Sequence, residues 1–134
     1  HGVDSWANQM TVEEPRARKL PVPHHGFTGQ QSLRIGDQEV LCFYPGPGHA
    51  RDNIVVWFSS EKILFGGCLV KDLKSNNLGN THDGDVPRYA ATVQQVLERF
   101  GSARLIVPGH GEPGGTDLLR HTKELAEKAA AGHP

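Results

Sequence analysis

The chain has 134 residues, which is enough for one domain with a modest core. Its 14 Lys and Arg residues nearly balance 15 Asp and Glu residues, so the formal net charge is −1. This balance gives no electrostatic reason to expect nucleic acid or an anionic membrane as a partner, and no apolar run is long enough to span a bilayer. No signal peptide is recognisable, and two cysteines do not make a disulfide framework.

The first half of the chain has the pattern of short strands joined by turns. Residues 3–6 form a short predicted strand, and the capping-box pattern over 11–14 predicts a short helix after it. The Leu-Pro-Val-Pro run at 20–23 ends that helix and begins an extended loop. Two hairpins follow, because strand-like runs flank the turns at 36–37 and 59–61. These runs cover residues 32–35, 39–44, 54–58 and 62–65.

Two of these strands are apolar enough to lie in the core. Residues 54–58 are continuously apolar, which predicts a strand covered on both faces. Cys42 stands within the apolar run 40–44, and we interpret it as a free thiol in the core.

The second half predicts two helices and a short buried strand after a polar loop. Residues 71–88 are rich in Asn, Asp, Gly and Ser, and long polar loops in compact domains are often functional. The 3.6-residue spacing of apolar side chains predicts a helix over 89–100 and another that starts near Thr116. Residues 105–107 form the buried strand between them. There are no repeats or linkers, so residues 1–134 are predicted to be one domain.

Three potential metal ligands stand in glycine-rich turns, each directly after a predicted strand. His49 follows one glycine, Cys68 follows two, and His110 lies in a Pro-Gly-His-Gly turn. Glycine lets the backbone turn sharply or pass close to an ion, and imidazole with thiolate suits zinc. Ligands at three strand ends predict convergence at one rim of a sheet, and we expect the three to share a single ion.

The trio and its surroundings resemble the metallo-β-lactamases, in particular their first subclass, which uses a cysteine as a zinc ligand. The similarity runs in family order across nearly all of residues 2–134. It rests on GHARDN at 48–53, LFGGC at 64–68, Lys71, GN at 79–80, Asp83, PGHG at 108–111 and GG at 114–115. The resemblance implies an α+β fold, the αβ/βα sandwich, of which this chain supplies mainly the C-terminal αβ half.

The family's His-x-His-x-Asp motif, which supplies half of the metal ligands, does not occur in this sequence. The adjacent pair His24-His25 lacks the required spacing and stands in the wrong place. The chain is therefore expected to be the C-terminal portion of such an enzyme, whose other half would pack on it sheet to sheet. An uncovered inner sheet face would favour association, either as a homodimer or with a complementary N-terminal fragment.

The resemblance also implies roles for individual residues. His49 belongs to the family's three-histidine zinc site, and Cys68 and His110 belong to the second zinc site. Intact enzymes hold two Zn²⁺ ions, and this chain alone is expected to hold one at most. Lys71 is expected to bind the substrate carboxylate, and Asn80 to donate to the lactam carbonyl oxygen. The alternatives are a solvated lysine and an ordinary turn asparagine.

The nucleophile in this family is hydroxide held at zinc, so no side chain is expected to attack the substrate. Arg51 and Asp52 either frame the site through hydrogen bonds or form a structural ion pair in the loop. His82 is either exposed or reaches a metal that lacks its full ligand set.

Three functions remain open from the sequence. The first is zinc-dependent hydrolysis of β-lactams, which confers antibiotic resistance in the periplasm, by an intact or complemented enzyme. The second is a catalytically silent zinc-binding half-domain that dimerises or pairs with a separate fragment. The third is a glyoxalase-type thiolester hydrolase of the same superfamily, and Cys68 with Lys71 and Asn80 counts against it.

Overall fold

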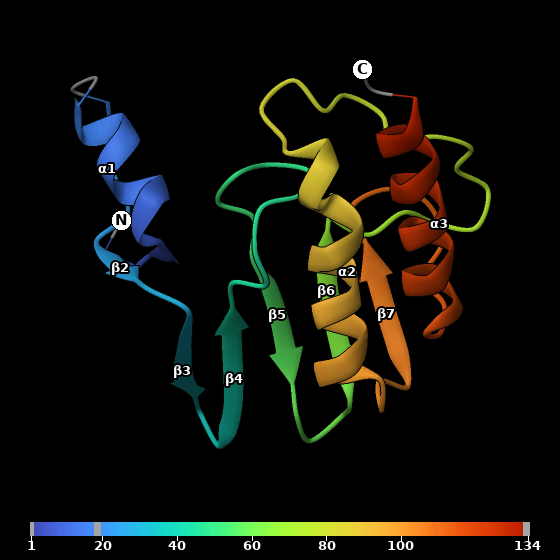
Figure 1. Cartoon of the computed structure of the whole chain (residues 1–134). Helices are drawn as coiled ribbons and strands as arrows, with labels where there is room; N and C mark the ends of the chain where they lie inside the picture. Colours follow the sequence, from blue (N-terminus) through green and yellow to red (C-terminus); the bar gives the residue numbers. More distant parts are fainter. Residues whose placement is uncertain (1, 18–19, 133–134) are drawn as a thin grey trace.

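A computed structural model describes residues 2–17 and 20–132. Its strands are β1 (Trp6–Asn8), β2 (His25–Phe27), β3 (Gln30–Ile35), β4 (Gln38–Phe43), β5 (Val55–Phe58), β6 (Ile63–Gly67) and β7 (Leu105–Pro108). Its helices are α1 (Gln9–Ala17), α2 (Val86–Phe100) and α3 (Asp117–Ala131). Figure 1 shows α1, β1 and β2 to one side of a larger sheet that carries α2 and α3.

The larger sheet has the strand order β3-β4-β5-β6-β7. Neighbouring strands are antiparallel from β3 to β6, and β6 pairs with β7 in parallel. Strands β4, β6 and β7 therefore point toward the same edge of the sheet, as their arrows show in Figure 1. The loops that carry His49, Cys68 and His110 all leave the sheet at this edge.

One face of the sheet is covered by α2 and α3, and the main core lies between them. Alternate residues of a strand point to opposite faces, so Val55, Leu64 and Ile106 share this face and are fully buried against the two helices. Tyr89 of α2 is also fully buried, and its hydroxyl donates to the carbonyl of Leu69 over 2.9 Å. The core thus ties the helices to the strands that precede the candidate ligands.

The opposite face of the sheet is also apolar, and we call it the open sheet face. Cross-strand partners point to the same side, and the register places these residues on it: Val40, Cys42, Val56, Phe58, Ile63, Phe65, Leu105 and Val107. Phe65 and Leu105 remain 48% and 37% exposed there. Cys42 is a buried free thiol, as predicted, and burial raises its pKa.

The N-terminal segment differs from its prediction. The first strand lies at Trp6–Asn8 rather than at 3–6. Helix α1 begins at Gln9, because the side chain of Asn8 accepts a hydrogen bond from the amide of Met10. The capping-box interpretation is wrong, since the Thr11 hydroxyl donates to Asp52 instead. Strand β2 lies where a loop was expected, because it pairs in parallel with β1, a partner distant in sequence.

Helix α2 also starts earlier than its apolar periodicity predicts. The carboxylate of Asp85 accepts from the amide of Arg88, so the helix begins at Val86 and the polar loop ends at residue 85 rather than 88. Strand β5 is not covered on both faces, because only Val55 is fully buried and residues 56–58 are half-buried. Both hairpins, the strand at 105–107 and the start of α3 near Thr116 are confirmed, but within 105–107 only Ile106 is buried.

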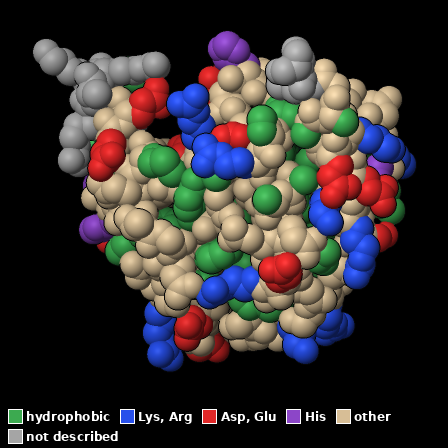
Figure 2. Space-filling view, viewed as in Figure 1, with side chains coloured by type: hydrophobic (Ala, Val, Ile, Leu, Met, Phe, Trp, Pro, Cys, Tyr) green, Lys and Arg blue, Asp and Glu red, His purple; other side chains and the backbone are tan. Residues whose placement is uncertain are grey.

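The surface seen from the side of α2 and α3 carries interspersed charges. Figure 2 shows Lys and Arg side chains alternating with Asp and Glu on this face, and neither sign gathers into a patch. Among the described residues, no helix combines the length and the apolar character needed to cross a bilayer.

The buried position of Leu64 makes a direct prediction about stability. Leu64→Ala leaves a cavity between the sheet and the helices, and we expect the free energy of unfolding to fall by about 2–5 kcal/mol. Urea denaturation followed by circular dichroism measures this change. Leu73→Ala is the matched control, because Leu73 is 54% exposed. Equal stability of the two variants would contradict the placement of the core.

Candidate metal centre

Cys68 and His110 meet at the edge of the sheet. They follow the neighbouring parallel strands β6 and β7, and the Cys68 Sγ lies 3.8 Å from the His110 Nε2. The amide of Gly109 donates to the carbonyl of Gly67 over 2.7 Å, which draws the two turns together. A Cβ at Gly109 would lie 2.6 Å from the Cys68 amide nitrogen, so only glycine allows this approach.

His49 stands on a turn that several hydrogen bonds fix. The side chain of Asn53 accepts from the amide of Ala50 and donates to the carbonyl of Gly46. From α2, the hydroxyl of Thr92 donates to the carbonyl of Pro47. In this part of the chain, the His49 Nδ1 is buried and has no hydrogen-bond partner in the structure. A buried polar atom of this kind is costly unless it binds something.

The three candidate ligands do not form one cluster. Within residues 2–17 and 20–132, no group of three or more His, Cys, Asp or Glu side chains is placed to hold an ion. The expectation that His49, Cys68 and His110 share a single ion therefore stays a prediction. Strand β5 lies between β4 and β6, yet the His49 turn reaches the Cys68 turn, because a Cβ at Gly48 would lie 2.6 Å from the Leu69 side chain.

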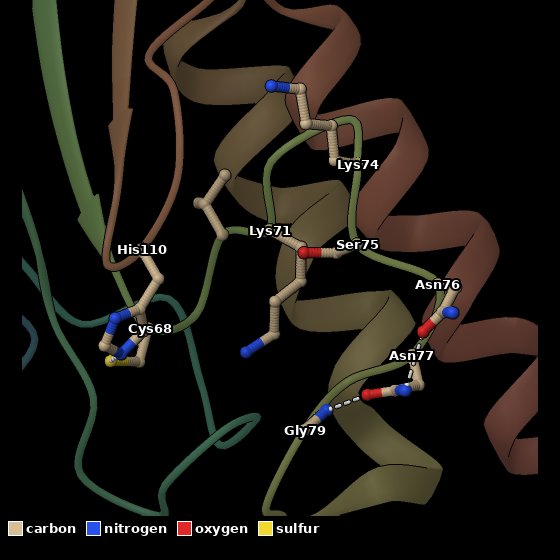
Figure 3. A pocket seen from close by; sticks show the side chains of 9 residues that line it. Cys68, Lys71, Lys74, Ser75, Asn76, Asn77, Gly79 and His110 are labelled. Atoms are coloured by element: carbon tan, nitrogen blue, oxygen red, sulfur yellow. Dashed lines mark hydrogen bonds between the residues drawn. The ribbon is translucent and has the colours of Figure 1, made fainter.

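Lys71 shares a pocket with the Cys68–His110 pair. The pocket has a volume of about 270 Å³ and is lined by Cys68, Val70, Lys71, Lys74, Ser75, Asn76, Asn77, Gly79 and His110. Figure 3 shows the His110 ring beside the Cys68 sulfur, and the Lys71 side chain extending into the space between this pair and Gly79. The Lys71 Nζ lies 4.0 Å from where a Cβ at Gly79 would stand.

The charged side chains at this edge of the sheet shift the pKa values of His49 and Lys71. Burial lowers the pKa of His49, and the positive charges of Lys71 and His110 lower it further. The His49 imidazole is therefore neutral at pH 7, which is the form that binds a metal. Burial lowers the pKa of Lys71, while the Cys68 thiolate opposes that shift. The pKa of His49 thus responds to charged residues of the pocket, although His49 is not one of the residues that line this pocket.

Asn80 and His82 lie outside this pocket. Asn80 is exposed, and its side-chain oxygen accepts from the His82 amide, as in an ordinary turn. The proposed contact of Asn80 with a substrate stays a prediction. A separate cavity of about 760 Å³ is lined by Met10, Glu14, Ala50, Arg51, Asp52, His82 and Asp83. The structure thus places His82 with Arg51 and Asp52 rather than with the Cys68–His110 pair.

Several residues that support the site had no clear signal in the sequence. Thr122 of α3 accepts from the Lys71 amide over 2.8 Å, and His121 lies 2.8 Å from the carbonyl of Ser75. Asp72 binds Ser75 and is buried. The one signal in the sequence was Thr122 within the apolar stripe of α3, because a buried hydroxyl group needs a hydrogen-bond partner.

The Cys68–His110 geometry can be tested against zinc. Bond lengths of about 2.3 Å to sulfur and 2.0–2.1 Å to nitrogen, at a tetrahedral angle, place two ligand atoms about 3.6 Å apart. The observed separation of 3.8 Å agrees with this value. The donor types and the unpartnered Nδ1 of His49 also fit the metal. The residues present therefore fit zinc as a partial ligand set.

Comparison with known proteins extends this finding. The chain is 47% identical over 127 residues to "Metallo-beta-lactamase type 2" of Bacteroides fragilis, covering 95% of the chain and 51% of that protein. It is 40% identical over 124 residues to the protein of the same name from Bacillus cereus, covering 92% and 48%. The chain belongs to the metallo-β-lactamase family. It spans about half the length of the curated relatives it matches.

Solved structures of metallo-β-lactamases confirm the α+β fold. A metallo-β-lactamase from Pontibacter korlensis superposes with a TM-score of 0.89 at 38% identity, over 94% of this chain and 59% of that one. The DIM-1 metallo-β-lactamase, in a crystal exposed to ceftazidime, gives a TM-score of 0.86 at 39% identity, over 95% and 57%. No protein-family model matches this metallo-β-lactamase sequence.

Proposed function

We propose that this chain contributes to zinc-dependent hydrolysis of the β-lactam amide, within an enzyme whose remaining metal ligands lie outside the described residues. The Cys68–His110 pair carries the proposal, because its 3.8 Å separation suits two ligands of one zinc ion. The similarity to metallo-β-lactamases supports the same chemistry. A serine or cysteine nucleophile is not needed for it.

Each residue of the centre has a distinct task in this proposal. Cys68 and His110 would hold one zinc ion, and His49 would contribute to a second site. When bound, zinc acidifies a water molecule and polarises a carbonyl, which supplies the nucleophile and the electrophile of amide hydrolysis. The neutral imidazole of His49 needs no deprotonation before it binds a metal.

Lys71 would orient the substrate in this pocket. Its side chain is half-buried, and its ammonium group has lost part of its hydration, which lowers its pKa. A carboxylate on the substrate would replace that lost water with an ion pair in a partly dry site. The Lys71 amide is held by Thr122, so the backbone beneath the side chain is fixed.

One observation favours a second candidate function, a catalytically silent zinc-binding unit. Among the described residues, two donors stand in contact and no third His, Cys, Asp or Glu completes the set. Water or a borrowed side chain would then complete a tetrahedral ion without producing a reactive centre. Measurement of turnover separates the two candidates.

The open sheet face supports a proposal about partners. In the αβ/βα sandwich that the resemblance implies, this face packs against the other half of the enzyme. Phe65 and Leu105 are exposed on it, so the isolated chain would gain free energy by covering them. We place the complete enzyme in the periplasm, as the resemblance implies, and cell fractionation tests this.

Zinc binding by the chain itself tests the proposed function. We expect Cys68→Ser to weaken zinc binding by at least about tenfold, because a hydroxyl replaces the thiolate that zinc prefers. Equilibrium dialysis with metal analysis measures the difference. Cys42→Ser is the matched control, since Cys42 is the other cysteine and is buried on the open sheet face in β4. Equal zinc content in all three proteins would remove Cys68 from the ligand set.

A further inference from the structure

Asp72 is a carboxylate that the function proposed above does not use. It lies in the loop that carries Cys68 and Lys71, and only 8% of its surface is exposed. Aspartate is rarely buried without a partner. Its contacts therefore indicate what holds it there.

The two sides of this carboxylate bind two different loops. On one side, Oδ1 accepts from the Ser75 amide at 3.0 Å and from the Ser75 hydroxyl at 2.6 Å. On the other side, the backbone amide of Glu112 donates to the carboxylate. A Cβ at Gly111 would overlap Oδ2, so the turn beside His110 lies directly against Asp72.

The loop on the Ser75 side is itself anchored. The Ser75 carbonyl contacts His121 of α3, and the Lys71 amide donates to Thr122 of the same helix. These contacts, which run from α3 through Ser75 and Asp72 to Glu112, therefore connect the helix to the turn that presents His110.

We propose that Asp72 is a positioning residue that sets the distance between Cys68 and His110. The inference rests on the proposed function only in its last step, that this distance serves zinc. Asp72 touches neither ligand, so it acts through the backbone of Gly111 and Glu112. If Asp72 only stabilised its own turn with Ser75, its loss would leave the His110 turn unchanged.

The test uses the full chain and two independent readouts. The first is amide hydrogen exchange at Glu112 in metal-free protein, where we expect Asp72→Ala to raise the rate at least about tenfold. The second is zinc affinity by competition with a chromophoric chelator, where we expect about 10–100-fold weaker binding, the usual cost of losing a residue that orients a ligand. Asp37→Asn, in an exposed hairpin turn, is the matched control.

A near-isosteric variant guards against loss of folding. Asp72→Asn has one side-chain oxygen instead of two, so it can accept from Ser75 but not from Ser75 and Glu112 on both sides at once. We therefore expect intermediate values of both readouts with an unchanged circular dichroism spectrum. Unchanged exchange at Glu112, or unchanged zinc affinity with increased exchange, would overturn the inference. If the unaltered chain bound no zinc, the proposed function would fail, and exchange at Glu112 would still decide whether Asp72 holds the turn.

Discussion

The isolated 134-residue chain is expected to show no turnover of a chromogenic cephalosporin above the buffer rate, even with zinc in excess. Its described residues bring two donors into contact, and no group of three is placed to hold an ion. Enzymes accelerate their reactions by roughly 10⁶-fold or more, so an incomplete centre loses nearly the whole effect. The measurement is initial-rate absorbance on mass-verified protein.

Adding the missing ligands should restore the reaction. A separately produced segment that carries a His-x-His-x-Asp motif, mixed with this chain, is expected to raise the rate by at least about 10³-fold if the two pair. His110→Ala in the mixture is the control, and it should return the rate to the buffer level. Fast turnover by the chain alone would show that a full centre assembles without added ligands and would refute the silent-unit candidate.

The second large effect concerns association through the open sheet face. We expect the chain to dimerise at micromolar concentration, because each Å² of apolar surface removed from water contributes about 25 cal/mol. Phe65→Lys should weaken this association more than about 100-fold, since an unpaired charge in an apolar contact costs about 3–5 kcal/mol. Sedimentation equilibrium measures the dissociation constant.

Leu73→Lys is the matched control for this experiment. Leu73 is as exposed as Phe65 but lies in the loop after β6, away from the open sheet face. It should leave the association unchanged. A folded monomer of the unaltered chain that persists on concentration would show that the exposed face is tolerated. Equal effects of the two substitutions would place the contact elsewhere.

The sequence predicted the elements whose signals are local. The glycine and aspartate at 36–37 fixed the first hairpin, and apolar spacing located α2 and α3. It failed where a distant partner decides the structure. Strand β2 exists because β1 lies beside it, and Thr11 does not cap α1 because Asp52 engages its hydroxyl.

The sequence by itself determined the family and the chemical types of the candidate ligands, because both follow from side-chain identity and motif order. Only the tertiary structure decided which ligands meet. Cys68 and His110 come together because β6 and β7 are neighbours, and the His49 turn meets the Cys68 turn through the contact of Gly48 with Leu69. The link from Asp72 to Glu112 joins residues 40 positions apart in sequence, so no local pattern reveals it. Strand order, which long-range pairing sets, therefore controls the geometry of this centre.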